Sequence, residues 1–172
     1  MANSPLLHAG PAVGFDQPFE MLLACHDRVR RSLDLLLRLQ AHAATHGADE
    51  QAQDAARDVL RYFDLAGPKH HEDEERHVLP RLRAEGQDEL ADRLAADHAE
   101  MSHQWAALRP ALEALRDGSA QSLDAAACQA YAALYAAHMA AEEGQAFPAA
   151  SRQLGTEALA AMGAEMAGRR RG

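Results

Sequence analysis

Apolar residues recur at helical spacing over four long stretches of this sequence. The first stretch runs from Phe19 to a glycine stop at His46-Gly47, and the second runs from about Asp49 to Arg83. The third and fourth cover about 88–116 and 122–143, and no alternating strand pattern competes with them. The apolar positions that define the four stripes are Leu22, Leu23, Val29, Leu33, Leu36 and Leu37; Ala56, Val59, Leu60, Phe63 and Leu65; Leu90, Leu94, Met101, Trp105, Leu108 and Leu112; and Ala127, Tyr131, Leu134 and Tyr135.

Four long helices joined by short connections predict an all-α protein, an up-down-up-down four-helix bundle with a short C-terminal helix over about 156–167. Gly67-Pro68 predicts a kink within the second helix, and Pro110 is expected to bend the third helix or bring its end forward. The expected organisation is an irregular arm over 1–15, the bundle over 16–150, and a short helix with a basic tail over 151–172.

The composition agrees with a helical protein and limits its partners. Aromatic residues are only 5% of the chain, while Ala, Leu, Arg and Glu dominate, which favours helix over sheet. A net charge of -9 argues against nucleic acid, because phosphate binding requires a basic surface. The one basic cluster, Arg169-Arg170-Arg171, is expected to be a solvated end. The acidic surface and the size favour a monomer or a small homo-oligomer.

The same residues bear on the compartment. No apolar run approaches the roughly 20 residues that span a bilayer, so no membrane partner is expected. Residues 1–17 have no basic region followed by an apolar core, the pattern of a secretory signal. Cys25 and Cys128 do not form a disulfide framework, and buried apolar packing is expected for both. We therefore expect a cytoplasmic, reduced protein.

A repeated pair of residues carries the first chemical signal. His70 and Glu74 stand four residues apart, and His138 and Glu142 repeat the spacing. In both copies a second Glu follows directly and a Pro lies ten residues after the His. Residues four apart share one face of a helix, so each pair can direct an imidazole and a carboxylate at the same point. Alone, each pair reads equally well as a solvated surface pair.

The first and third helices each add one histidine on the apolar stripe, His26 and His98. Either one alone is more often a core residue bonded to a neighbour than a ligand. Four core histidines with two buried glutamates would carry a large desolvation cost, which a metal offsets by coordinating them all. The candidate metal ligands are therefore His26, His70, Glu74, His98, His138 and Glu142.

Ligand chemistry narrows the choice of metal. Four imidazoles and two carboxylates without a thiolate suit iron, manganese or zinc in a dinuclear centre. Two iron ions are our prediction, because redox chemistry with small gases requires iron, and zinc or manganese are the alternatives. Water or hydroxide would complete the coordination and leave a position for a small molecule.

The remaining histidines and nearby side chains have less specific roles. His71 is either a further ligand or a supporting hydrogen-bond donor, and His77 is expected to be structural rather than a ligand. His103 is expected to point aside. Glu75 and Glu143 are expected to support the ligands or lie on the surface, His8, His42 and His46 to lie on the surface or in loops, and Tyr131, Tyr135 and Trp105 to be packed in the core or to wall a pocket.

Taken together, these motifs resemble the hemerythrin-like family, the HHE cation-binding domains, over about residues 16–150. The resemblance implies a four-helix bundle with a non-haem di-iron centre, held by the six candidate ligands with both glutamates bridging the irons. The residues that carry it are Cys25-His26-Asp27, His70-His71-x-x-Glu74-Glu75-x-x-Val78-Leu79-Pro80, Asp97-His98, and His138-x-x-x-Glu142-Glu143-x-x-Ala146-Phe147-Pro148.

The resemblance implies a fifth histidine on the third helix, which the oxygen-carrying members of the family have, and this chain departs from them at that position. Position 102, four residues after His98, is Ser, which argues against stable oxygen carriage. The expected function is binding of dioxygen or nitric oxide for sensing, storage or detoxification. The alternatives are a di-iron enzyme (an oxidase, a peroxidase, a nitric oxide reductase or a protein like those that repair iron–sulfur clusters) and a metal-stabilised helical interaction protein.

Overall fold

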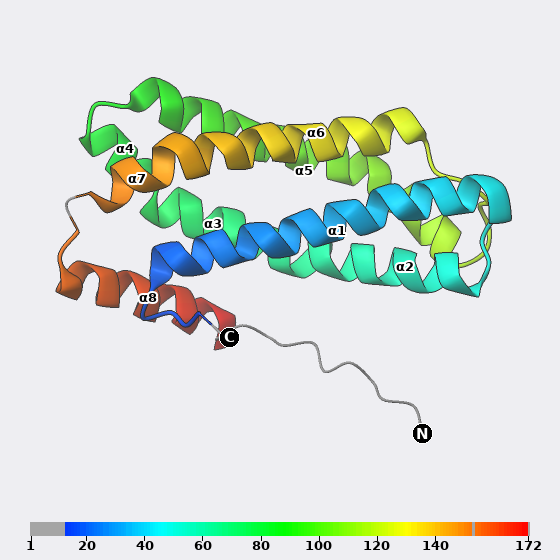
Figure 1. Cartoon of the computed structure of the whole chain (residues 1–172), viewed down its shortest axis with the longest axis horizontal. Coiled ribbons are helices and arrows are strands. Elements are labelled where there is room, and N and C mark those ends of the chain that lie inside the picture. The colour runs from blue at the N-terminus through cyan, green and yellow to red at the C-terminus, as the bar shows by residue number, and fades with distance from the viewer. Residues whose placement is uncertain (1–12, 153, 172) are drawn as a thin grey trace.

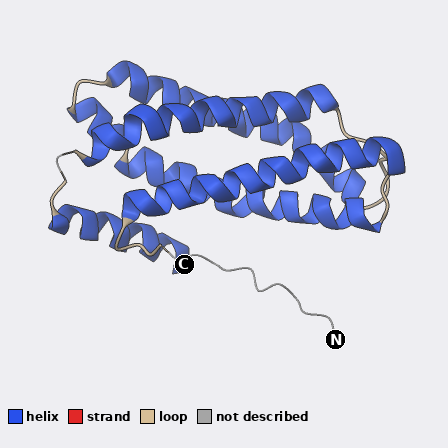
Figure 2. Cartoon of the chain, in the orientation of Figure 1, coloured by secondary structure: helices blue, strands red, loops and turns tan. Residues whose placement is uncertain are grey.

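The computed structural model describes residues 13–152 and 154–171, and helices make up nearly all of this part of the chain (Figure 2). His8 and most of the expected N-terminal arm lie outside the described residues. The elements are α1 Pro18–His46, α2 Glu50–Arg61, the π-helical turn η1 Tyr62–Ala66, α3 Gly67–His77, α4 Leu79–Ala84, α5 Asp88–Arg116, α6 Ala125–Ala141, the π-helical turn η2 Glu142–Ala146, α7 Phe147–Ser151 and α8 Thr156–Arg171.

The long helices form a closed ring of neighbours, in which α1 packs on α2, α2 on α5, α5 on α6 and α6 on α1 (Figure 1). Successive helices run in opposite directions, so the predicted all-α four-helix bundle is confirmed. The short α8 packs beside α1 at the end of the bundle where α4 and α7 meet. None of the described helices has both the length and the apolar character needed to cross a bilayer.

The predicted kink in the second helix is a π-turn rather than a break. The N–H of Gly67 donates to the carbonyl of Tyr62, five residues back, and Pro68 follows in the first turn of α3. In the fourth helix the N–H of Phe147 likewise donates to the carbonyl of Glu142, and Pro148 follows. Because proline lacks an N–H, the ladder loses a bond at each site, and one extra residue in the turn accommodates the loss.

Pro110 did not shorten the third helix, contrary to one of the two expected outcomes, because α5 continues through it to Arg116. The start of α1 also differs from a side-chain-capped helix: Gln17 precedes Pro18 and makes no capping hydrogen bond. Capping by aspartate occurs elsewhere, where Asp49 accepts from the N–H of Ala52 at the start of α2.

The core consists of two apolar clusters with a polar layer between them. One cluster lies toward the α1–α2 connection and includes Leu36, Val59 and Leu112, and the other lies toward α4, α7 and α8 and includes Leu22 and Leu82. Two predicted stripe residues are instead exposed, Leu23 at 41% and Leu65 at 61%. Leu65 lies within η1, where the extra residue changes the phase of the helix, so a regular period assigns it to the wrong face.

The basic tail is not the solvated end that we expected. Arg169 and Arg170 belong to α8 and both donate to Asp73 on α3, whose side chain is fully buried. The helix also approaches the chain closely at Gly163, where an added Cβ would collide with the carbonyl oxygen of Phe15. These contacts attach α8 to the helix that carries His70 and Glu74.

This ion-pair cluster predicts an asymmetric response to mutation. Replacing both Arg169 and Arg170 by Ala leaves Asp73 buried without its partners, which should lower the free energy of unfolding by about 3–5 kcal/mol. Asp73→Ala should cost less, because the two guanidinium groups are partly exposed and can hydrate. Urea unfolding measures both, with the exposed Arg171→Ala as the control expected to change little. An equal or larger loss for Asp73→Ala would contradict the assignment.

Candidate metal centre

The six predicted ligand residues meet in the polar layer of the core. Their side chains come from α1, α3, α5, α6 and the first residue of η2, and none is more than 3% exposed. One ligand atom from each residue lies within 4.8 Å of the others in two overlapping groups. The first group is His26, His70, Glu74 and Glu142, and the second is Glu74, His98, His138 and Glu142.

The two glutamates belong to both groups because each divides its oxygens between them. Glu74 Oε1 lies 2.9 Å from His70 Nε2 and 3.7 Å from His26 Nε2, while its Oε2 lies 3.2 Å from His98 Nε2. Glu142 shows the same division: its Oε2 lies 3.1 Å from His26 Nε2 and its Oε1 lies 3.2 Å from His138 Nε2. Each carboxylate therefore directs one oxygen to the His26 side and the other to the side of His98 and His138.

These short distances do not satisfy all the polar atoms. Both oxygens of Glu74 and Oε1 of Glu142 are buried without a hydrogen-bond partner among the described residues. Burying an unsatisfied carboxylate oxygen is costly, so native structures rarely do it without a reason. The imidazole nitrogens and carboxylate oxygens instead face shared spaces, which is the arrangement that a bound cation would satisfy.

The imidazoles of His98 and His138 give the same indication. Their Nε2 atoms are 3.1 Å apart and face each other. Two neutral nitrogens presenting lone pairs would repel each other, and two N–H groups would collide, so the contact requires one shared proton or one shared cation. The donor set of imidazole nitrogens and carboxylate oxygens fits iron, manganese or zinc.

The outer nitrogen of three of the four imidazoles has a carboxylate partner. Nδ1 of His26 lies 2.8 Å from Glu143, whose carboxylate also accepts from Arg30. Nδ1 of His98 lies 3.0 Å from Glu75. Such bonds hold the ring orientation and leave Nε2 free to face the centre. The predicted supporting positions of Glu75 and Glu143 are confirmed.

The sequence did not predict what the outer nitrogens of His138 and His70 contact. Nδ1 of His138, on α6, lies 3.1 Å from Asp97 on α5, a partner that the sequence showed only as the neighbour of His98. Nδ1 of His70 is buried without a hydrogen-bond partner among the described residues. Burial raises the pKa of the adjacent Cys25 thiol, but His70 and nearby arginines outweigh this and lower it. His70 is thus held differently from the other three.

Protonation compensates the buried carboxylates in the metal-free protein. Burial alone would lower the pKa of His26, but the carboxylates of Glu142 and Glu74 outweigh it and raise the pKa to about 9. The same opposition raises the pKa of His70 well above its ordinary value, with the charge of Glu74 as the main favourable cause. Burial would raise the pKa of Glu74, yet the charge of His70 holds it well below its usual range.

The other histidines lie outside this cluster. The ring of His71 stacks on His98 with centroids 4.2 Å apart, and burial, with the charge of His98, lowers its pKa well below the ordinary value. His77 pairs with Glu165 of α8, which confirms a structural position. His42 bonds to Asp49. His46 and His103 are partly or fully exposed, as expected for surface residues.

Comparison with known proteins gives the same assignment. The family described as Hemerythrin HHE cation binding domain matches residues 17–150, which include all six clustered side chains. The chain belongs to the hemerythrin HHE cation-binding family. A protein of Haemophilus influenzae described as uncharacterized is 32% identical over 158 residues, which is 91% of each chain. This hemerythrin-like protein is therefore a member of a cation-binding family whose members typically bind iron.

The Ser102 side chain of this hemerythrin-like protein turns away from the cluster. Its hydroxyl donates to the carbonyl of His98 on its own helix, 3.0 Å away. Two further features near the cluster were missed by sequence reasoning. The π-turn η2 begins at Glu142 itself, and Asp73, beside Glu74, is bonded to α8. The repeated glycine- and proline-containing segments were the available signal for the π-turns. Nothing in the sequence indicated that the arginines of the C-terminal tail pair with Asp73.

The raised pKa of His26 predicts a pH dependence of stability in chelator-treated protein. Its pKa is about 9 when folded and 6.5 in the free side chain, so folding holds this proton more tightly. The stabilisation is complete below about pH 6.5 and is lost as the pH rises through about 9, a decrease on the order of 3 kcal/mol. Urea unfolding across this range measures it, and His26→Gln should flatten the curve. A constant or rising stability of the native sequence would contradict the coupling.

Proposed function

We propose that this protein holds two iron ions in the polar layer and binds a small molecule, dioxygen or nitric oxide, at an exchangeable coordination position. The ligands would be His26, His70, Glu74, His98, His138 and Glu142. His26 and His70 would hold one ion, His98 and His138 the other, and the two glutamates would bridge them. Iron in such a centre supplies reversible one-electron chemistry and a position that a small molecule can occupy.

The observation that carries this proposal is the division of each carboxylate between the two imidazole pairs. Glu74 and Glu142 each direct one oxygen at the His26 side and the other at the His98–His138 side. A single ion would leave one carboxylate oxygen of each glutamate facing an uncompensated imidazole pair. Two ions satisfy the oxygens and nitrogens of both groups together.

The donor count supports an exchangeable position. Each group offers two imidazole nitrogens and two carboxylate oxygens, which is four donors, whereas iron accepts up to about six. Ser102 does not add a metal-ligand atom, because its hydroxyl donates a hydrogen bond to the carbonyl of His98. His71 stacks on His98, and its Nε2 has no hydrogen-bond partner among the described residues, so it is close to the centre without belonging to either group.

A second candidate, an iron-dependent oxidase or peroxidase, is favoured by access. His98 borders a cavity of about 300 Å³ that also contacts Tyr131, Tyr135 and Trp105. A cavity that reaches a ligand residue beside oxidisable side chains would admit a substrate larger than a diatomic gas. Glu75 and Asp97 would hold the His98 and His138 rings in place, and the apolar clusters on either side would limit the entry of water.

Metal stoichiometry tests the ligand assignment directly. The native chain, expressed with ample iron, should contain about two metal ions per chain by elemental analysis. Glu142→Ala and Glu74→Ala should each reduce the content to one ion or fewer and lower the melting temperature, because each removes a donor from both ions. Glu100→Ala and His103→Ala, two exposed positions on α5, are the matched controls expected to retain both ions. A Glu142→Ala protein that keeps both ions would contradict the bridging role.

Anaerobic reconstitution with ferrous iron separates the two candidate functions. Optical spectra should change on addition of nitric oxide or dioxygen, because either can occupy the exchangeable position. A change that reverses when the gas is removed supports a binding protein, whereas continuous consumption of dioxygen or peroxide with an added reductant supports an enzyme. A spectrum that none of the three molecules alters would argue against both.

A further inference from the structure

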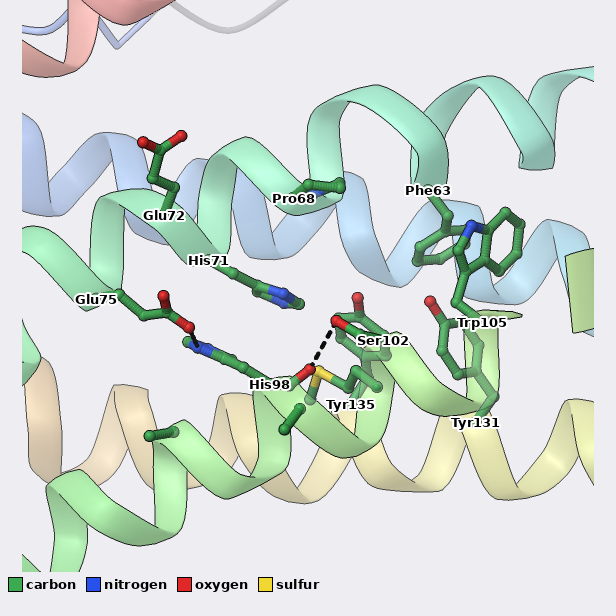
Figure 3. Close-up of a pocket in the computed structure, with 13 residues that line it drawn as sticks. Phe63, Pro68, His71, Glu72, Glu75, His98, Ser102, Trp105, Tyr131 and Tyr135 are labelled. Carbon is green, nitrogen blue, oxygen red and sulfur yellow. Dashed lines mark hydrogen bonds and ion pairs between the residues drawn. The ribbon is translucent and has the colours of Figure 1, made fainter. Parts of the chain in front are cut away.

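The cavity beside His98 is a site in its own right, with a volume of about 300 Å³ (Figure 3). Residues of η1 and α3 form one side, residues of α5 form the other, and α6 closes the inner face. A single-ring organic molecule fits within this volume, which is at the lower end of small-molecule sites and far larger than a diatomic gas requires.

Ser102 lies on the exposed side of the cavity and does not fill it. It lies four residues after His98, on the same face of α5, and lines the cavity. Its short side chain is held back against its own helix by the bond to the His98 carbonyl (Figure 3).

Flat rings form the walls. His71 stacks on Tyr135 with centroids 5.7 Å apart and an interplanar angle of 27°, and Trp105 stacks on Tyr131 at 5.9 Å with the same angle. Phe63 packs against Trp105 and completes the far end. Aromatic faces and edges select planar partners, and they contribute beyond the apolar area that they bury.

One polar atom in this wall lacks a partner. Nε2 of His71 is buried and makes no hydrogen bond with any described residue, and the ring is directed into the cavity (Figure 3). An unsatisfied buried nitrogen is unfavourable, so a ligand hydroxyl that bonds to it would be favoured. The nitrogen lies on a ring stacked directly on His98, at the end of the cavity next to the candidate metal centre.

The carboxylates that border the cavity disfavour anions. Glu72 and Glu75 are partly exposed and border the cavity, and none of its described lining residues is Lys or Arg. A carboxylate or phosphate entering here would be repelled without a compensating cation. The occupant should therefore not be an anion, and the apolar and aromatic part of the lining suits a neutral ring.

We propose that this cavity binds a small uncharged phenol or hydroquinone, with its ring between the aromatic walls and a hydroxyl bonded to Nε2 of His71. The site consists of protein atoms alone, so it goes beyond the proposed iron function and stands or falls separately from it.

The test uses 4-fluorophenol as the probe and the full chain in both chelator-treated and iron-loaded form. Fluorine NMR should show a saturable shift or broadening of the probe in both forms, and the emission of Trp105, the single tryptophan, should change in parallel. The anion 4-fluorobenzoate should bind at least tenfold more weakly. Absence of a saturable change with 4-fluorophenol, or equal binding of the anion, would overturn the proposal even if the iron centre is present.

Two variants locate the bound probe. Ser102→Leu places a larger side chain in the cavity lining and should weaken binding at least tenfold, whereas His103→Leu, the exposed neighbour outside the lining, should bind as the native chain does. His71→Phe keeps a flat ring but removes the nitrogen and should weaken binding about fivefold to tenfold. Thermal melting monitors folding of each variant. Native affinity in Ser102→Leu overturns the location, and native affinity in His71→Phe overturns the hydroxyl contact.

Discussion

The structure depends on satisfying six buried ionisable groups in one layer. Glu74 and Glu142 are fully buried, and the histidines around them are at most 3% exposed. No single helix contains enough partners for its own members, because each glutamate faces imidazoles from other helices as well as its own. The bundle must therefore bring four helices into one register, or the layer becomes an unpaired charge between two apolar clusters.

Several local features hold that register. The π-turns η1 and η2 lie just before Pro68 and Pro148, and they adjust the phase of the two helices that carry the repeated His–Glu pairs. Carboxylates on neighbouring positions orient three of the rings, as Asp97 of α5 does for His138 of α6. On the other side of α3, Asp73 attaches α8 next to Glu74. Protons on the imidazoles stabilise the layer when no cation is bound, and a cation would displace them.

The chain belongs to the hemerythrin HHE cation-binding family, and a cavity lies next to the candidate site. Ser102 contributes no ligand atom and leaves space beside His98, which His71 and two tyrosines border. Ser102 thus lines an aromatic cavity of about 300 Å³ without contributing to the cluster of candidate ligands.

The sequence by itself determined the four helices and the six residues that meet, because helical periodicity places His26, His98 and both His–Glu pairs on buried faces. It placed Leu65 on a buried face, although this side chain is exposed, because a π-turn changes the helical phase that a regular period assumes. The bonds of Asp97 to His138 and of Asp73 to Arg170 join residues 41 and 97 positions apart, and the cavity joins four elements. Only the tertiary structure decided these, because they depend on how far each helix is rotated and shifted against its neighbours, which spacing within one helix does not specify.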